Sequence, residues 1–84
     1  MGLYFITFRS VTFAQRGEKL LNRHQIRCDL MRTPRWMEEQ GCGYALKLRT
    51  DDIRRALTLL GENRVQMRRV YAQREDGTME EVTV

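Results

Sequence analysis

An 84-residue chain is long enough for one domain and too short for two, so we expect residues 1–84 to form a single domain. The composition, 42% hydrophobic and 31% charged, is typical of a globular protein and disfavours disorder for the body of the chain. The net charge is +4, but the 13 arginines and two lysines are scattered, which favours a solvated surface over a phosphate-binding patch.

The sequence gives no sign of a membrane-inserted segment. Its apolar run near the start, residues 3–6, is far too short for a bilayer span or a signal-peptide core. Two widely spaced cysteines do not form the disulfide framework of a secreted protein. We therefore expect a cytoplasmic protein with no membrane partner, in which both cysteines are thiols at rest.

The first half of the chain predicts a strand, a helix and a second strand. Residues 3–8 are aromatic and apolar on both alternating faces, as in a central strand. Ser10 is a suitable N-cap for a helix over residues 11–22, whose apolar positions recur at helical spacing. Residues 26–31 alternate as in a half-buried strand, which Thr33-Pro34 ends. Residues 35–41 are expected to be a loop or a short helical turn.

The second half predicts a strand, a helix and a hairpin. Residues 44–48 alternate as in a third strand. Thr50 is a suitable cap for an amphipathic helix that we expect to stop at Gly61, a favoured residue after a helix end. Residues 65–72 predict a fourth strand. The sequence Glu-Asp-Gly-Thr at residues 75–78 predicts a type I′ turn, after which residues 79–84 would form an edge strand.

The order of these elements predicts an α+β fold. Two successive βαβ halves, βαββαβ, are typical of a ferredoxin-like sandwich, in which an antiparallel sheet carries both helices on one face. Residues 73–84 would add a C-terminal β-hairpin extension. Because the first strand is apolar on both sides, we expect the second sheet face to be at least partly covered, for example in a homodimer.

The two cysteines lie in different contexts. Cys28 shares the alternation phase of Ile26 and Leu30, so it is expected to be a small core residue. Cys42 lies between Gly41 and Gly43, where the loop becomes the third strand. The glycines either serve the turn or give an exposed thiol backbone freedom and space, and the residues alone leave both interpretations open.

Several segments together resemble one family. They are YFITFRS (residues 4–10), EKLLN (18–22), TPR (33–35), GCGYALKL (41–48) and TDDIRRAL (50–57). The chain is similar over roughly residues 3–71 to the selenium/sulfur (Se/S) carrier protein-like family, whose cysteine corresponds to Cys42 and whose following glycine corresponds to Gly43. The resemblance implies a carrier rather than a stand-alone enzyme.

A carrier of this kind would hold a persulfide or selenopersulfide on the Cys42 thiol. The resemblance implies a donor such as a cysteine desulfurase and an acceptor enzyme as partners, with no cofactor and no metal. A partner can supply the acid and base groups, so only exposure and ionisation of the thiol are needed in this chain. Gly41 and Gly43 would let the cysteine enter a partner's cleft.

Charged and aromatic residues near Cys42 are further candidates. The carboxylates of residues 38–39 would raise the pKa of a nearby thiol. Arg32, Arg35 and Arg49 are candidates to offset them or to contact a partner. Trp36 either packs the loop onto the domain or serves as a partner-facing anchor.

Other functions remain open at this level. An RNA-binding module has the same element order and stacks bases on aromatic residues of its central strands, for which Tyr4 and Phe5 are candidates. His24, Cys28 and Cys42 could supply three metal ligands, and the two cysteines could form a redox disulfide. A protein-interaction module without thiol chemistry is the remaining alternative.

Overall fold

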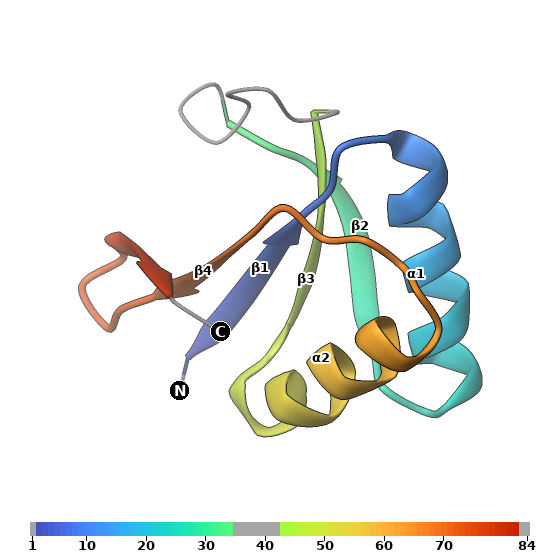
Figure 1. Cartoon of the computed structure of the whole chain (residues 1–84). Coiled ribbons are helices and arrows are strands. Elements are labelled where there is room, and N and C mark those ends of the chain that lie inside the picture. The colour runs from blue at the N-terminus through green and yellow to red at the C-terminus, as the bar shows by residue number, and fades with distance from the viewer. Residues whose placement is uncertain (1, 35–42, 83–84) are drawn as a thin grey trace.

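The computed structural model describes residues 2–34 and 43–82, with the elements in the predicted order (Figure 1). They are β1 (Leu3–Thr7), α1 (Val11–Arg23), β2 (Cys28–Arg32), β3 (Tyr44–Arg49), α2 (Ile53–Glu62), β4 (Arg69–Gln73) and β5 (Met79–Val82). A 3-10 turn, Thr50–Asp52, precedes α2. Neither helix of the described chain has the length and apolar character needed to cross a membrane.

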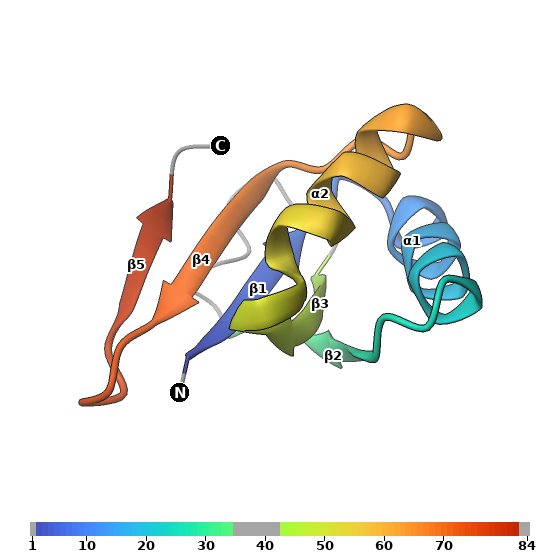
Figure 2. The same cartoon turned by 90° about the horizontal axis from the view of Figure 1, so that it is seen from below.

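The described strands form one antiparallel sheet in the order β2-β3-β1-β4-β5. Both helices lie on the same side of this sheet, as Figure 2 shows. Among the first four strands β3 and β1 are central, which is the arrangement that two βαβ halves produce. The predicted ferredoxin-like α+β fold is confirmed, and β5 extends it as a C-terminal hairpin.

The main core lies between the helices and the sheet. Alternation along β1 points Ile6 towards the helices and Phe5 towards the opposite face. Apolar stripes on both helices cover the first of these faces. The buried residues of this core are Ile6, Phe8, Ala14, Leu20, Leu21, Ile26, Cys28, Leu46, Leu48, Ile53, Ala56, Leu60, Val65 and Val70.

Gly17 lets α1 approach the core closely. A Cβ atom at this position would lie 3.2 Å from Leu46 Cδ1, 3.2 Å from Leu60 Cδ2 and 3.3 Å from Phe8 Cζ. All three distances are shorter than ordinary van der Waals contacts between carbon atoms. The glycine therefore permits the close contact of α1 with the sheet and α2, and a larger residue would require these side chains to shift.

Local hydrogen bonds define both ends of α1. The Ser10 hydroxyl accepts from the Phe13 backbone N–H at 3.2 Å, which confirms the predicted N-cap. At the other end Gln25 has a φ of 64°, and the Ile26 N–H donates to the Leu21 carbonyl at 2.8 Å. This is a Schellman motif, in which Ile26 is buried as part of the helix end. For this reason β2 begins at Cys28, later than the sequence predicts.

The end of α2 differs from the prediction. The helix continues through Gly61 and ends one residue later, so the prediction of Gly61 as its stop residue was wrong. The left-handed residue is Arg64, with a φ of 57°, and the Val65 N–H donates to the Leu60 carbonyl at 2.9 Å. Burial of Val65 completes a second Schellman motif, which explains why β4 begins only at Arg69.

The hairpin between β4 and β5 is present, but its predicted turn type was wrong. A type I′ turn needs positive φ at both central residues, whereas Asp76 has none and Gly77 has a φ of 90°. The Gly77 N–H donates to the Arg74 carbonyl at 2.9 Å, so Glu75 and Asp76 are the central residues. The Asp76 carboxylate accepts from the Thr78 hydroxyl and backbone N–H, which favours this alternative.

Side chains of the chain itself partly cover the sheet face opposite the helices. Phe5 and Tyr71 are 5% and 7% exposed there, and they form a second cluster with Leu3, Met31 and Met79. The expectation of a partly covered second face is met within the chain. A homodimer through this face stays a prediction.

Candidate functional site

The predicted carrier residue lies outside the described part of the chain. Cys42 and its neighbours Arg35, Trp36 and Gly41 belong to residues 35–42, which the structure does not describe. The residues that flank this segment are described. They show where in the fold it starts and ends, and which charged groups are found there.

Thr33 and Gly43 close the connection between β2 and β3. The Thr33 N–H donates to the Gly43 carbonyl at 3.0 Å, next to the regular pair formed by Arg32 and Tyr44. Gly43 has a φ of 84°, in the left-handed region where glycine alone carries no Cβ penalty. We refer to this end of the sheet, marked by Thr7, Thr33 and Gly43, as the Gly43 end.

Thr33 was not predicted as a site residue. It is 7% exposed, and its Oγ1 atom is buried without a hydrogen-bond partner among the described residues. Such an unsatisfied hydroxyl is uncommon in folded proteins, because each one costs free energy that a partner would recover. Thr33 therefore offers a hydrogen-bonding group at the Gly43 end. A lone threonine before a proline gives no signal of this in the sequence.

Arg9 and Arg32 place positive charge at the Gly43 end, where the described carboxylate of Glu81 is already paired with Arg69. The Arg32 guanidinium lies 5.4 Å from the centre of the Tyr44 ring and remains exposed. Helix α1 begins at the same end of the sheet, directly after β1 (Figure 1), with Arg9 before it and no acidic residue in its first turn. A helix N-terminus carries a partial positive charge. Such surroundings favour the thiolate form of a nearby cysteine.

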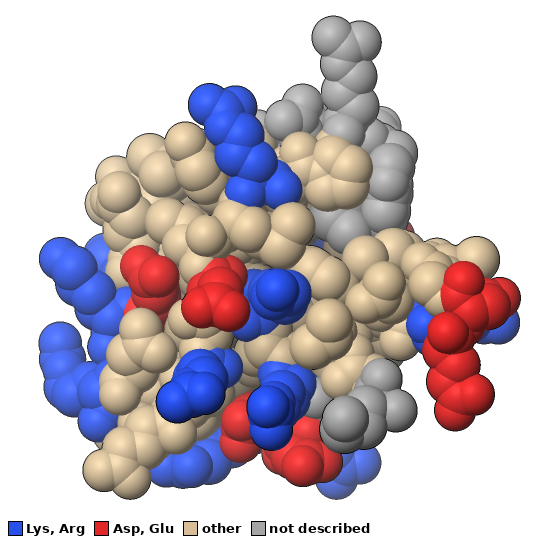
Figure 3. Space-filling view, turned by 180° about the vertical axis from the view of Figure 1, so that it is seen from behind, with Lys and Arg blue, Asp and Glu red and all other residues tan. Residues whose placement is uncertain are grey.

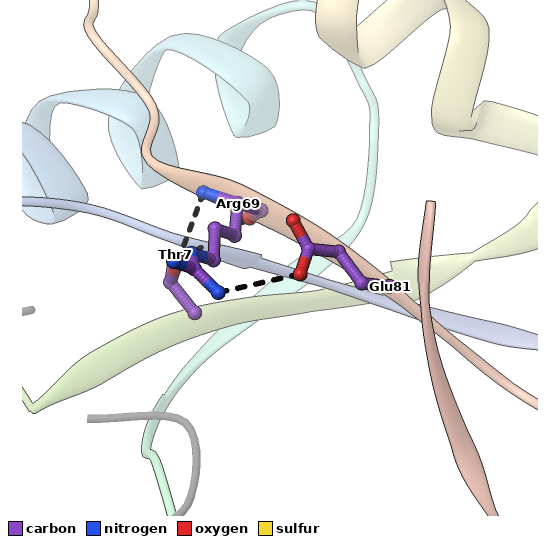
Figure 4. A network of polar contacts seen from close by, with 3 residues as sticks. All are labelled: Thr7, Arg69 and Glu81. Atoms are coloured by element: carbon purple, nitrogen blue, oxygen red, sulfur yellow. Dashed lines mark hydrogen bonds and ion pairs between the residues drawn. The ribbon is translucent and has the colours of Figure 1, made fainter. Parts of the chain in front are cut away.

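A polar network on the neighbouring strands orders this part of the sheet (Figure 4). The buried Thr7 hydroxyl accepts from the Arg69 backbone N–H at 3.1 Å and donates to the Arg69 carbonyl at 3.3 Å. The Arg69 side chain reaches across to Glu81 on β5, with 3.3 Å between Nη1 and Oε1. The network ties β1, β4 and β5 together.

Arg49 is not brought to the Gly43 end. It is the last residue of β3, whose first residue, Tyr44, lies about 17 Å away at the usual rise of an extended strand. Of the two predicted arginines that are described, only Arg32 therefore lies where the segment containing Cys42 ends. Arg49 lies beside a separate pocket.

Cys28 is a core residue, as predicted. It is 5% exposed, and its sulfur lies 3.9 Å from both the Glu18 carbonyl oxygen and Asn22 Oδ1 on α1. Burial, and to a lesser degree the carboxylates of Glu18 and Asp29, raise the pKa of the Cys28 thiol to about 11. A thiol that is both buried and protonated is a poor nucleophile.

The described residues give little support to the metal and disulfide alternatives. His24 is exposed whereas Cys28 is buried, and no three His, Cys, Asp or Glu residues of the described ranges gather into a possible metal site. Cys42, the remaining member of both proposed sets, lies outside those ranges. Its chain neighbour Gly43 is separated from Cys28 by the length of β2, about 16 Å, whereas disulfide-bonded residues have Cα atoms within about 7 Å.

The aromatic residues on the described strands are not arranged for base stacking. Tyr4 and Tyr44 pack against the core on the helix side of the sheet. Phe5 is on the opposite face but is only 5% exposed, and the β3 residues of that face, Ala45, Lys47 and Arg49, are not aromatic. Stacking needs an accessible ring face, so the described sheet disfavours the RNA-binding alternative.

Comparison with known proteins gives one match. The family model described as "Putative Se/S carrier protein-like" matches residues 3–72, a range that contains β1 to β3, both helices and most of β4 but not β5. No curated protein and no solved structure matches the chain. Because the matched range spans most of the 84 residues, the chain belongs to the Se/S carrier protein-like family.

Proposed function

We propose that this protein carries sulfur or selenium on Cys42 between a donor enzyme and an acceptor enzyme. The burial of Cys28 carries the proposal, together with family membership. The sequence has two cysteines, and one of them is enclosed in the core with a pKa raised to about 11. Any chalcogen that this chain holds on a thiol would therefore be on Cys42.

The chemistry is a transfer between thiols. The Cys42 thiolate attacks the outer sulfur of a donor persulfide, R–S–SH, forms Cys42–S–SH and releases the donor as the thiolate R–S⁻. An acceptor nucleophile then attacks the same outer sulfur and regenerates the Cys42 thiolate. The sulfur moves at the zero-valent level in both steps, so neither step needs an added oxidant or reductant. Arg9 and Arg32 at the Gly43 end support the proposal because their charge favours a thiolate there and would offset the carboxylates of residues 38–39.

A loading experiment tests the proposal. The protein is incubated with a cysteine desulfurase and cysteine, without reductant, and its intact mass is measured before and after dithiothreitol treatment. We expect a gain of one sulfur atom that dithiothreitol removes, and selenocysteine in place of cysteine tests selenium in the same way. Cys42→Ser should abolish the gain, and the matched variant Cys28→Ala should retain it.

Two results would contradict the carrier role. A Cys42→Ser variant that still gains a sulfur atom would show that Cys42 is not the residue that holds it. A folded wild-type protein that gains no sulfur or selenium from any donor would leave the protein-interaction module as the better description. A far-UV circular dichroism spectrum of each variant separates loss of chemistry from loss of fold.

A further inference from the structure

A small pocket lies at the end of the sheet opposite to the Gly43 end. The pocket is on the sheet face away from the helices. Figure 3 shows this face, where many Lys and Arg side chains lie on the half opposite to the acidic β4–β5 hairpin. The pocket has a volume of about 260 Å³. Its lining residues are Leu3, Arg27, Asp29, Lys47, Leu48 and Arg49.

The strand register brings like charges together in this pocket. The antiparallel ladder ends with the pair Cys28 and Leu48; Arg27 and Arg49 are the next residues on the two chains, and both line the pocket. In the adjacent row Asp29 pairs with Lys47, and these two charges balance. The row of Arg27 and Arg49 keeps a charge of +2. Like charges across neighbouring strands are unfavourable.

The two arginines of the pocket are not neutralised by an ion pair within the described chain. The ion pairs of the described residues, Arg69 with Glu81 and Arg74 with Glu80, are both on the β4–β5 hairpin and not in the pocket. Arg27, Lys47 and Arg49 make no ion pair with a described residue. The sequence, in which these cations are scattered, favours a solvated surface. The fold instead gathers three of them around one hollow.

We propose that this pocket binds a small phosphate monoester through Arg27 and Arg49. A phosphate dianion matches the charge of the arginine row, and the forked guanidinium groups match the geometry of its oxygens. Lys47 adds a third donor. The Asp29 carboxylate would repel phosphate but accept a hydrogen bond from a hydroxyl group, so the ligand carries a hydroxyl near its phosphate.

The volume of the pocket suits a small phosphate monoester better than a drug-sized molecule. Pockets for drug-sized molecules have volumes of about 300–1,000 Å³, and this one is smaller. The assignment does not depend on the carrier role, because Arg27 and Arg49 lie at the other end of the sheet from Gly43.

Titration with glycerol 3-phosphate at low ionic strength tests the assignment. We expect saturable amide shifts in the NMR spectrum at residues 27–29 and 47–49, with glycerol and chloride as inactive controls. Arg27→Gln and Arg49→Gln should each weaken binding by about tenfold. Arg9→Gln removes the same charge at the opposite end of the sheet and should change the affinity by less than about twofold.

Thermal unfolding gives a second readout. In phosphate-free buffer Arg49→Gln should raise the Tm, because it removes the repulsion from Arg27. At the same concentration, added glycerol 3-phosphate should raise the Tm of the wild type more than that of the variant, since the folded state that binds the ligand more tightly is stabilised more. A structural role for Arg49 alone would not produce this difference.

Three outcomes would overturn the assignment. Equal weakening by Arg9→Gln would show that only net charge matters, and shifts no larger than those caused by chloride would show that there is no phosphate site. An oligoribonucleotide that binds more tightly than glycerol 3-phosphate, and that depends on Arg27 and Arg49, would identify the pocket as a nucleic-acid contact instead.

Discussion

Cys28 should be almost inert towards alkylation while the protein is folded. In the Cys42→Ser variant it is the only thiol, so its reactivity can be measured without interference. Its pKa is raised from 9.0 to about 11, mainly by burial. At about pH 8 this shift alone lowers the thiolate fraction by roughly 100-fold relative to the unfolded chain. Exclusion of the reagent from the core adds to that factor.

The assay is a time course with iodoacetamide, followed by intact mass. The native Cys42→Ser variant is compared with the same variant unfolded in guanidinium chloride at the same pH. We expect the native rate to be at least about 100-fold lower, because only the thiolate reacts. A native rate within a few fold of the unfolded rate would refute the assignment of Cys28 to the core. Cys28 could then carry the chalcogen as well, and its assignment to Cys42 alone would fail.

The stability of the fold gives three further predictions. Urea titrations should show that Gly17→Ala lowers the free energy of unfolding by about 1 kcal/mol, because overpacking outweighs the gain in helix propensity. Gly61→Ala should instead raise the free energy of unfolding by about 0.5–1 kcal/mol, since no atom lies within 4 Å of the new Cβ. Arg64→Gly should raise the Tm, since glycine relieves the left-handed backbone of this residue, and an unchanged or lower Tm would contradict this. Between about pH 9 and 11 the unfolded chain loses the Cys28 proton while the folded chain keeps it. The free energy of unfolding should therefore fall with rising pH by up to about 2–3 kcal/mol. A Cys28→Ala variant whose stability has the same pH profile as that of the wild type would exclude Cys28 as the cause.

Periodicity predicted the order of elements because both helices and the outer strands bury one face, and the run of apolar residues in β1 indicated a strand buried on both faces. The N-cap Ser10 and the core position of Cys28 followed from the same local signals. The stop of α2 did not, because the sequence rule favours glycine as the left-handed residue. In the fold, the helix ends where Val65 can enter the core, and Arg64 takes the left-handed conformation beside it. Tertiary burial thus outweighed the local preference.

The surroundings of the candidate site were less predictable. Arg32 and Arg49 both lie within ten residues of Cys42 in the sequence, but only Arg32 is at the Gly43 end. An extended strand carries Arg49 to the far end of the sheet and places it at the same pocket as Arg27, a residue 22 positions away in the sequence. Such proximity follows from register, which depends on how both strands meet the core. No local pattern reports it.

Helix α1 helps to give the two ends of the sheet opposite effects on a thiol. Its second half covers Cys28, where Glu18 and the loss of water disfavour the thiolate. Its N-terminus, with Arg9 before it and no carboxylate in the first turn, lies at the Gly43 end and favours an anion. The same helix therefore protects one thiol from chemistry and provides a positive environment at the end of the sheet where the segment containing the other begins and ends. A carrier with a single reactive thiol needs this separation, because a second ionised cysteine would compete for the transferred sulfur.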